Sequence, residues 1–150
     1  MPDRTRLVIG LGASAGGIDA FKAFFSKMPA DTGMAFVLVQ HLDPNYQSSL
    51  VAIVAGYTAM PVHLVEDAME IGPNQVYVIP PDAILTIRGG SLHLTRPAPP
   101  AARRISINTF LTSLAEDQGE NAVGIILSGS GSDGTLGVKA IKECGGFTVA

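Results

Sequence analysis

Ser14 lies in a glycine-rich segment whose spacing suits two different kinds of chemistry. The segment, residues 10–17, follows the short apolar run 7–9. As G-x-S-x-G, with Gly12 and Gly16 around Ser14, it matches a nucleophile elbow, the strand-to-helix turn that exposes a serine for acyl transfer. As G-x-G-x-x-A it matches a dinucleotide-binding turn, in which glycines let the backbone approach a pyrophosphate. The turn alone leaves both chemistries open.

A histidine and an aspartate follow two other apolar runs. His41 comes directly after the run 35–40, and Asp133 lies in a Gly/Ser-rich segment that follows the run 122–127. Because parallel strands end at one edge of a sheet, we expect Ser14, His41 and Asp133 to converge there. His41 would take the serine proton near neutral pH, and Asp133 would orient the imidazole. These three side chains are of the types that make up a hydrolytic triad, and the Ala15 N–H is the expected oxyanion donor.

The dinucleotide alternative makes a different demand on the end of the second strand. It expects an acidic residue there to hold the ribose, but Gln40 and His41 occupy these positions and Asp43 comes later, in the loop. Nucleotide binding therefore stays open as the less favoured alternative. His63 and His93 fall inside expected strands, where structural or surface roles are expected, and no residue spacing indicates a metal site.

The elements that must position these residues alternate along the chain. Apolar runs at 6–12, 35–40 and 62–65 predict strands, and residues 16–27 and 45–57 have the spacing of amphipathic helices. This β-α-β-α-β order predicts an α/β fold, a doubly wound and mostly parallel sheet.

The later half of the chain breaks this pattern once before returning to it. Alternating runs on either side of Gly89-Gly90 predict an antiparallel hairpin at about residues 84–95, and the Pro/Ala-rich stretch 96–104 predicts a surface loop. Ser106 is the expected cap of a helix that ends near Asp117. Further expected elements are a strand at 122–127, a helix at 135–144 and a strand from 147. Because that strand meets the last residue, we expect the sheet to continue past residue 150.

Composition excludes several classes of function. The 150 residues are 47% hydrophobic and 15% charged, which is typical of one globular domain, and a net charge of −3 argues against a nucleic-acid partner. No apolar run is long enough to span a membrane. A single cysteine, Cys144, excludes an internal disulfide, and we expect it to be a small buried side chain in a cytoplasmic protein. The pairs Glu66-Asp67 and Glu116-Asp117 are interpreted as solvated charges.

Four segments resemble one known family. They are IGLGASAGG at 9–17, VQHL at 39–42, VYVIPP at 76–81 and LSGSGSDG at 127–134. In this order they look like the catalytic domain of CheB-type protein-glutamate methylesterases. Residues 41–44 and 113–117 look most like the methylesterase module of CheB–CheR fusion proteins, which join this domain to a methyltransferase.

The resemblance implies a function for the expected triad. Ser14, His41 and Asp133 match the family's catalytic motifs, and the family hydrolyses glutamyl methyl esters on chemoreceptors and in some members deamidates glutamine. It implies no metal or organic cofactor and a place in chemotaxis or related sensory signalling. The whole chain, 1–150, corresponds to an incomplete catalytic domain with no receiver domain. A non-catalytic, methylesterase-like interaction module remains the alternative.

This sequence departs from the family pattern at three places. Ser130 stands where the family often has methionine, in the loop whose backbone serves the oxyanion. Asn108 stands in a motif that often holds an aspartate. The expected helix 45–57 lacks the arginine that many members carry there. These departures bear on loop shape and substrate recognition more than on the triad.

Overall fold

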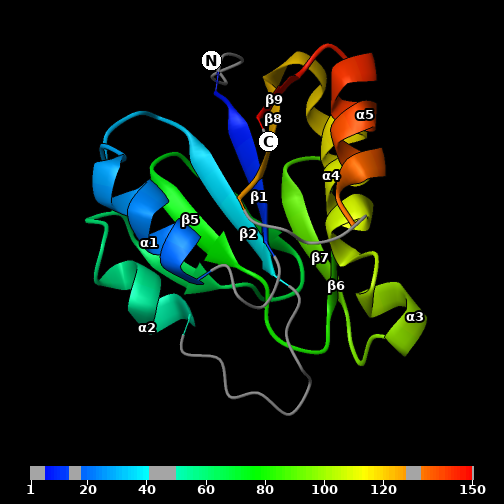
Figure 1. The fold of residues 1–150 in the computed structure, drawn as a ribbon, viewed down its shortest axis with the longest axis horizontal. Helices are drawn as coiled ribbons and strands as arrows, with labels where there is room; N and C mark the ends of the chain where they lie inside the picture. The colour runs from blue at the N-terminus through cyan, green and yellow to red at the C-terminus, as the bar shows by residue number, and fades with distance from the viewer. Residues whose placement is uncertain (1–5, 14–17, 41–49, 128–132, 150) are drawn as a thin grey trace.

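The main sheet of the fold is parallel throughout. The computed structural model describes residues 6–13, 18–40, 50–127 and 133–149. Six strands pair in the order β3-β5-β2-β1-β8-β9 (Figure 1). Their bounds are β1 Val8–Ala13, β2 Ala35–Gln40, β3 Val62–Leu64, β5 Gln75–Val78, β8 Ala122–Ile126 and β9 Phe147–Val149.

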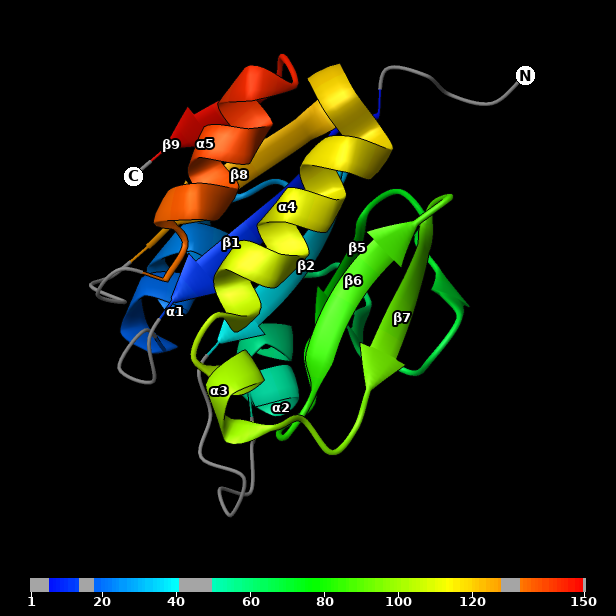
Figure 2. The same cartoon turned by 90° about the vertical axis from the view of Figure 1, so that its right-hand side faces the viewer.

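Helices cover both faces of this sheet, which confirms the doubly wound prediction. The helices α1 (Ile18–Lys27) and α2 (Leu50–Ala55) pack on one face, while α4 (Ser106–Gln118) and α5 (Thr135–Glu143) lie side by side on the other (Figures 1 and 2). Alternate residues of β2 divide between the two cores, because successive strand side chains point to opposite faces. Phe36 and Leu38 belong to the α1 core, and Val37 and Val39 belong to the α4 core.

The direction of the strand order changes at β1. From β1 the chain crosses through α1 to β2 on one side, whereas β8 and β9 lie on the other side and are joined through α5 on the opposite face. In open α/β sheets, ligands bind beyond the carboxyl ends of the strands at such a switch point. The topology therefore places the candidate site at the ends of β2, β1 and β8.

Glycines in β1 let α4 approach the sheet closely. A Cβ at Gly10 would lie 2.7 Å from Cδ2 of Leu111, and one at Gly12 would lie 2.6 Å from Cγ2 of Ile107. Both distances are below those that real Cβ atoms adopt, so a side chain at either position would force side chains of α4 to shift. Helix packing thus accounts for the G-x-G spacing without a bound phosphate.

The predicted hairpin at 84–95 is confirmed and belongs to a second, smaller sheet. β6 (Ile84–Arg88) and β7 (Ser91–Thr95) pair antiparallel, and the short β4 (Met69–Glu70) joins β7 on its other side (Figure 2). Gly89 and Gly90 connect them with φ of +60° and +76°, the conformation that a two-residue hairpin turn requires.

Two expectations about the remaining chain were wrong. The stretch 96–104 is not only a surface loop, because it forms the short helix α3 (Pro100–Arg103) and buries Ala98, whose N–H donates to the carbonyl of Asp82. Cys144 is exposed, because it caps the end of α5 outside the buried stripe of that helix. A single 3₁₀ turn, η1 (Gly119–Asn121), joins α4 to β8.

The helices of the described segments are too short or too polar to cross a membrane.

Candidate active site at the carboxyl ends of three strands

Three adjacent parallel strands end side by side at the candidate site. Ala13, the last residue of β1, pairs with Gln40, the last residue of β2, and the N–H of Leu127 after β8 donates to the carbonyl of Gly12 at 3.0 Å. Ser14 and His41 are the next residues along two of these strands. The sheet therefore brings the residues that precede Ser14 and His41 to one edge, as the triad prediction requires.

Most of the predicted site residues lie outside the described parts of the chain. These residues are Ser14, Ala15, His41 and Ser130. Their mutual geometry stays a prediction, and Asp133 is the one member of the predicted triad that the structure describes.

Asp133 is a buried carboxylate held against the first turn of α4. Its residue is 5% exposed, its Oδ2 accepts the N–H of Ile107 at 3.0 Å, and its Oδ1 accepts the N–H of Asn108 at 2.8 Å. The first N–H groups of a helix have no intrahelical partner and carry partial positive charge, so they suit an anion.

The side chain of Asn108 binds the start of α5, the helix that follows Asp133. Its side-chain Oδ1 accepts the N–H of Gly134 at 2.8 Å and the N–H of Gly137 at 3.0 Å. Gly134 is the N-cap of α5, so the Asn108 side chain caps α5 while the Asp133 side chain caps α4. We call these four hydrogen bonds the reciprocal cap.

The prediction that Ser106 caps this helix was wrong. Ser106 is the first residue of α4, the N-cap position belongs to Ile105, and no side chain of that residue completes the cap. A carboxylate 26 residues downstream of Ile107 does so instead. Local capping rules search only the residues beside the helix start, so they found neither Asp133 nor the role of Asn108. The sequence signal was Asn108 itself, a poor helix former in the first turn of a helix.

Gly134 fits its place for two reasons. Its φ is +105°, which disfavours residues with a Cβ, and a Cβ there would lie 2.8 Å from Cδ1 of Ile126 and 3.3 Å from Cγ2 of Ile107. The chain after Asp133 thus turns tightly between β8 and α4. This close fit fixes the position of the chain directly after Asp133.

Comparison with known proteins places this architecture in one family. The family model for CheB methylesterase matches residues 9–150. The chain belongs to the CheB methylesterase family. A solved structure, the CheB methylesterase catalytic domain of Thermotoga maritima, superimposes with a TM-score of 0.80 at 26% identity and covers 97% of this chain and 79% of that one.

Two curated CheB-family relatives carry the same name. Each is a protein-glutamate methylesterase/protein-glutamine glutaminase: one from Cupriavidus pinatubonensis is 33% identical over 150 residues, and one from Carboxydothermus hydrogenoformans is 34% identical over 151 residues. Each alignment covers 97% of this chain, but only 42% and 44% of the respective relative. The chain thus spans less than half the length of these proteins. The likeness to CheB–CheR fusion proteins stays a prediction.

Gln40 brings a polar side chain into the core of this CheB-family domain. It is 4% exposed and, by strand alternation, lies on the same face as Phe36 and Leu38. A dinucleotide-binding domain would place a ribose-binding carboxylate at this strand end. The described part of the site therefore offers an amide where that alternative needs an acid.

The two remaining histidines have structural partners. His63 shares a 2.6 Å hydrogen bond between its Nε2 and Oε1 of Gln75, and it stacks on Tyr77 with ring centroids 5.3 Å apart. His93 Nδ1 lies 3.9 Å from an oxygen of Asp67. Within the described residues, no group of three or more His, Cys, Asp or Glu side chains is placed to hold a metal.

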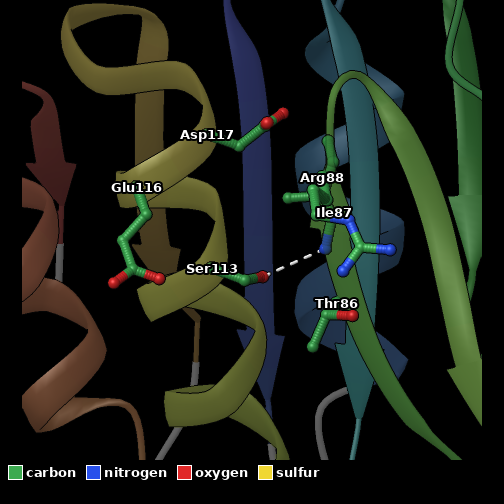
Figure 3. A pocket seen from close by; sticks show the side chains of 6 residues that line it. All are labelled: Thr86, Ile87, Arg88, Ser113, Glu116 and Asp117. Atoms are coloured by element: carbon green, nitrogen blue, oxygen red, sulfur yellow. Dashed lines mark hydrogen bonds between the residues drawn. The ribbon is translucent and has the colours of Figure 1, made fainter.

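A separate pocket of about 410 Å³ opens between β6 and α4 (Figure 3). Its polar side chains hold the hairpin: Ser113 Oγ accepts the N–H of Ile87 at 3.1 Å, and Asp117 accepts the N–H groups of Gly89 and Gly90 at 2.5 and 3.1 Å. The interpretation of Asp117 as a simple solvated charge was therefore wrong. Asp67 is exposed, as predicted for a solvated charge, and its Oδ1 also accepts the N–H of Leu94 at 2.9 Å. The residues that line the pocket are Thr86, Ile87, Arg88, Ser113, Glu116 and Asp117.

Proposed function

We propose that this chain is the catalytic domain of a serine esterase that hydrolyses glutamyl methyl esters on a receptor-type protein. The observation that carries the proposal is the buried Asp133 carboxylate, which binds the backbone of Ile107, a residue whose side chain packs against Gly12 near the end of β1. Family membership and the names of the curated relatives support the same reaction. Their second name, protein-glutamine glutaminase, extends the proposal to glutamine side chains, from which the same attack releases ammonia.

In the proposed reaction, each triad member has one task. His41 takes the proton of the Ser14 hydroxyl while Oγ attacks the ester carbonyl. The tetrahedral intermediate collapses, and methanol leaves with the proton that the imidazolium returns. Water, activated by the same imidazole, then attacks the acyl-enzyme and releases the glutamate carboxylate and free Ser14. The backbone N–H groups of Ala15 and Ser130 are the proposed donors to the oxyanion.

Asp133 supports the imidazolium that forms in both steps. Its two bonds from α4 fix the direction of the carboxylate, which is the proposed acceptor of the second ring N–H of His41. Burial strengthens this interaction, because the effective dielectric is lower away from water.

The test is methanol release from a methylated receptor fragment. Ser14→Ala should lose turnover by several orders of magnitude, and His41→Ala should lose about as much, because the triad acts as a unit. Ser91→Ala, in the second sheet, is the matched control and should retain wild-type turnover. A Ser14→Ala variant that still releases methanol at the wild-type rate would contradict the proposal.

A fluorophosphonate probe separates catalysis from mere binding. An activated serine should form a covalent adduct that maps to Ser14 and disappears in Ser14→Ala. A folded protein with no adduct, and with intact binding of the receptor fragment, would favour a non-catalytic interaction module instead.

A further inference from the structure

We propose that Asn108 is a positioning residue for Asp133, and that it fixes the carboxylate by binding the backbone on its far side. The inference rests on the proposed function, because it assigns a task in that same site. It concerns a residue that touches neither substrate nor the reacting atoms.

The reciprocal cap links Asp133 and Asn108 by hydrogen bonds in both directions. The Asp133 carboxylate accepts the backbone N–H of Asn108, and the Asn108 side chain accepts the backbone N–H of Gly134, the residue bonded to Asp133. The Asp133 side chain and the backbone directly after it are therefore both bound to Asn108. Rotation of the side chain would break the first bond, and movement of the backbone would break the second.

The backbone N–H of Gly134 depends on an acceptor from outside its own helix. Gly134 has the conformational freedom of glycine, and its N–H precedes the first full turn of α5, so no intrahelical carbonyl can accept it. A second bond, from the N–H of Gly137 to the same Asn108 oxygen, ties the first turn of α5 to the anchor. Without the Asn108 side chain, the Asp133 carboxylate would keep its two bonds to the α4 backbone, but the backbone N–H groups of Gly134 and Gly137 would lose their bonds to α4.

The two N–H groups that meet Asn108 make its position specific to an oxygen acceptor. Asn108 lies in the first turn of α4, and its oxygen accepts two N–H groups from the start of α5 that have no acceptor within their own helix. An aspartate supplies the same acceptor, which fits the resemblance noted from the sequence, where many family members carry an aspartate in this motif. Alanine supplies none.

The experiment compares Asn108→Ala, Asn108→Asp and a matched control in the full protein. Ser113→Ala is the control, because it also removes a partly buried hydrogen-bond acceptor from α4, nearer the other end of the helix. Asn108→Ala should lower kcat for methanol release about 10- to 100-fold with little change in KM, since small misplacements of a catalytic group cost about this much. Asn108→Asp should restore most of kcat, and Ser113→Ala should keep it.

A measurement without catalysis checks the geometry. Hydrogen exchange at the amides of Gly134 and Gly137 should accelerate in Asn108→Ala, remain slow in Asn108→Asp and remain slow in Ser113→Ala. Unchanged exchange at both glycines in Asn108→Ala would overturn the inference, and Asn108→Asp keeps the test available should Asn108→Ala not fold.

The outcomes also separate this inference from the proposed function. A folded wild type that hydrolyses no ester overturns both the function and the role of Asn108. An active wild type whose Asn108→Ala variant has the same kcat overturns the role of Asn108 alone. A loss of kcat in Ser113→Ala equal to that in Asn108→Ala would show that general weakening of α4 is the cause, and would likewise overturn it.

Discussion

Asp133 binds the first turn of the helix that carries Asn108, and Asn108 binds the first turn of the helix that follows Asp133. Two adjacent helices therefore begin at one shared anchor, directly beside the end of β8. A buried carboxylate costs free energy unless hydrogen bonds compensate for its lost hydration. The same bonds that compensate for burial also set the direction of the proposed catalytic aspartate.

Asp133→Asn should damage both activity and stability. The amide carries no charge, and its NH₂ group cannot accept a hydrogen bond, so one of the two backbone N–H groups that bind Asp133 would lose its acceptor. We therefore expect a loss of about 1.5–3 kcal/mol in the free energy of unfolding. Turnover should fall by about 10³- to 10⁴-fold, because the histidine tautomer is no longer set. Urea denaturation and methanol release measure the two effects.

Asp117→Asn is the control for that substitution. Its carboxylate also accepts two backbone N–H groups, from Gly89 and Gly90, but at the other end of α4. It should keep wild-type turnover. Equal turnover losses in the two variants would refute a special role for Asp133.

Local patterns predicted the elements and the sheet edge because those properties depend on neighbouring residues. Apolar runs and helical spacing placed β1, α1 and β2, and a Gly-Gly pair placed the hairpin with its left-handed turn. The rule that parallel strands share a carboxyl edge predicted that Asp133 lies beside that edge, and the next residue, Gly134, packs against Ile126 at the end of β8.

Partners distant in the sequence could not be predicted in this way. Asp133 meets Ile107 and Asn108 only because α4 and α5 pack against the same face of the sheet. The same reason explains the wrong predictions for Ser106 and Asp117: each was judged from its neighbours along the chain, whereas a residue from another element decides its hydrogen bonds.

Gly137→Ala should destabilise the protein, although alanine is the better helix former by about 1 kcal/mol. A Cβ at Gly137 would lie 2.5 Å from Cβ of Leu111, an atom that cannot move without displacing α4. We expect a loss of about 1–3 kcal/mol, typical of overpacking. Lys139→Ala, at an exposed site in the same helix, should change stability by less than about 0.5 kcal/mol. A Gly137→Ala variant as stable as wild type would contradict the close packing of α4 and α5.

Tyr77 should make stability fall in alkaline solution. Burial raises the pKa of its hydroxyl above the ordinary value, while the N–H of Gly72 and the charge of Arg6 act in the opposite direction. The folded state therefore keeps this proton at a pH where the unfolded state has lost it, so the free energy of unfolding declines as pH rises beyond about 10.

Two tyrosine variants check this slope. Tyr77→Phe removes the titrating group, so its free energy of unfolding should fall less steeply than that of wild type between pH 10 and 11, whatever its value at neutral pH. Tyr57→Phe, at a side chain that is 45% exposed, should leave the wild-type slope. Identical slopes for wild type and Tyr77→Phe in urea denaturation would show that Tyr77 is not responsible.

The glycines of β1 should prove to be packing residues and not part of a nucleotide site. Gly10 and Gly12 lie under Leu111 and Ile107 of α4, which occupy the space that a Cβ would need. NAD at about 1 mM should therefore change the melting temperature by less than about 1 °C. A ligand present at 100 times its Kd would add about 2.7 kcal/mol, or about 5–10 °C for a chain of this size. A shift of that size would revive the dinucleotide alternative.

Gly12→Ala should itself lower the melting temperature, because its Cβ would lie 2.6 Å from Cγ2 of Ile107. The decrease should be the same with and without NAD.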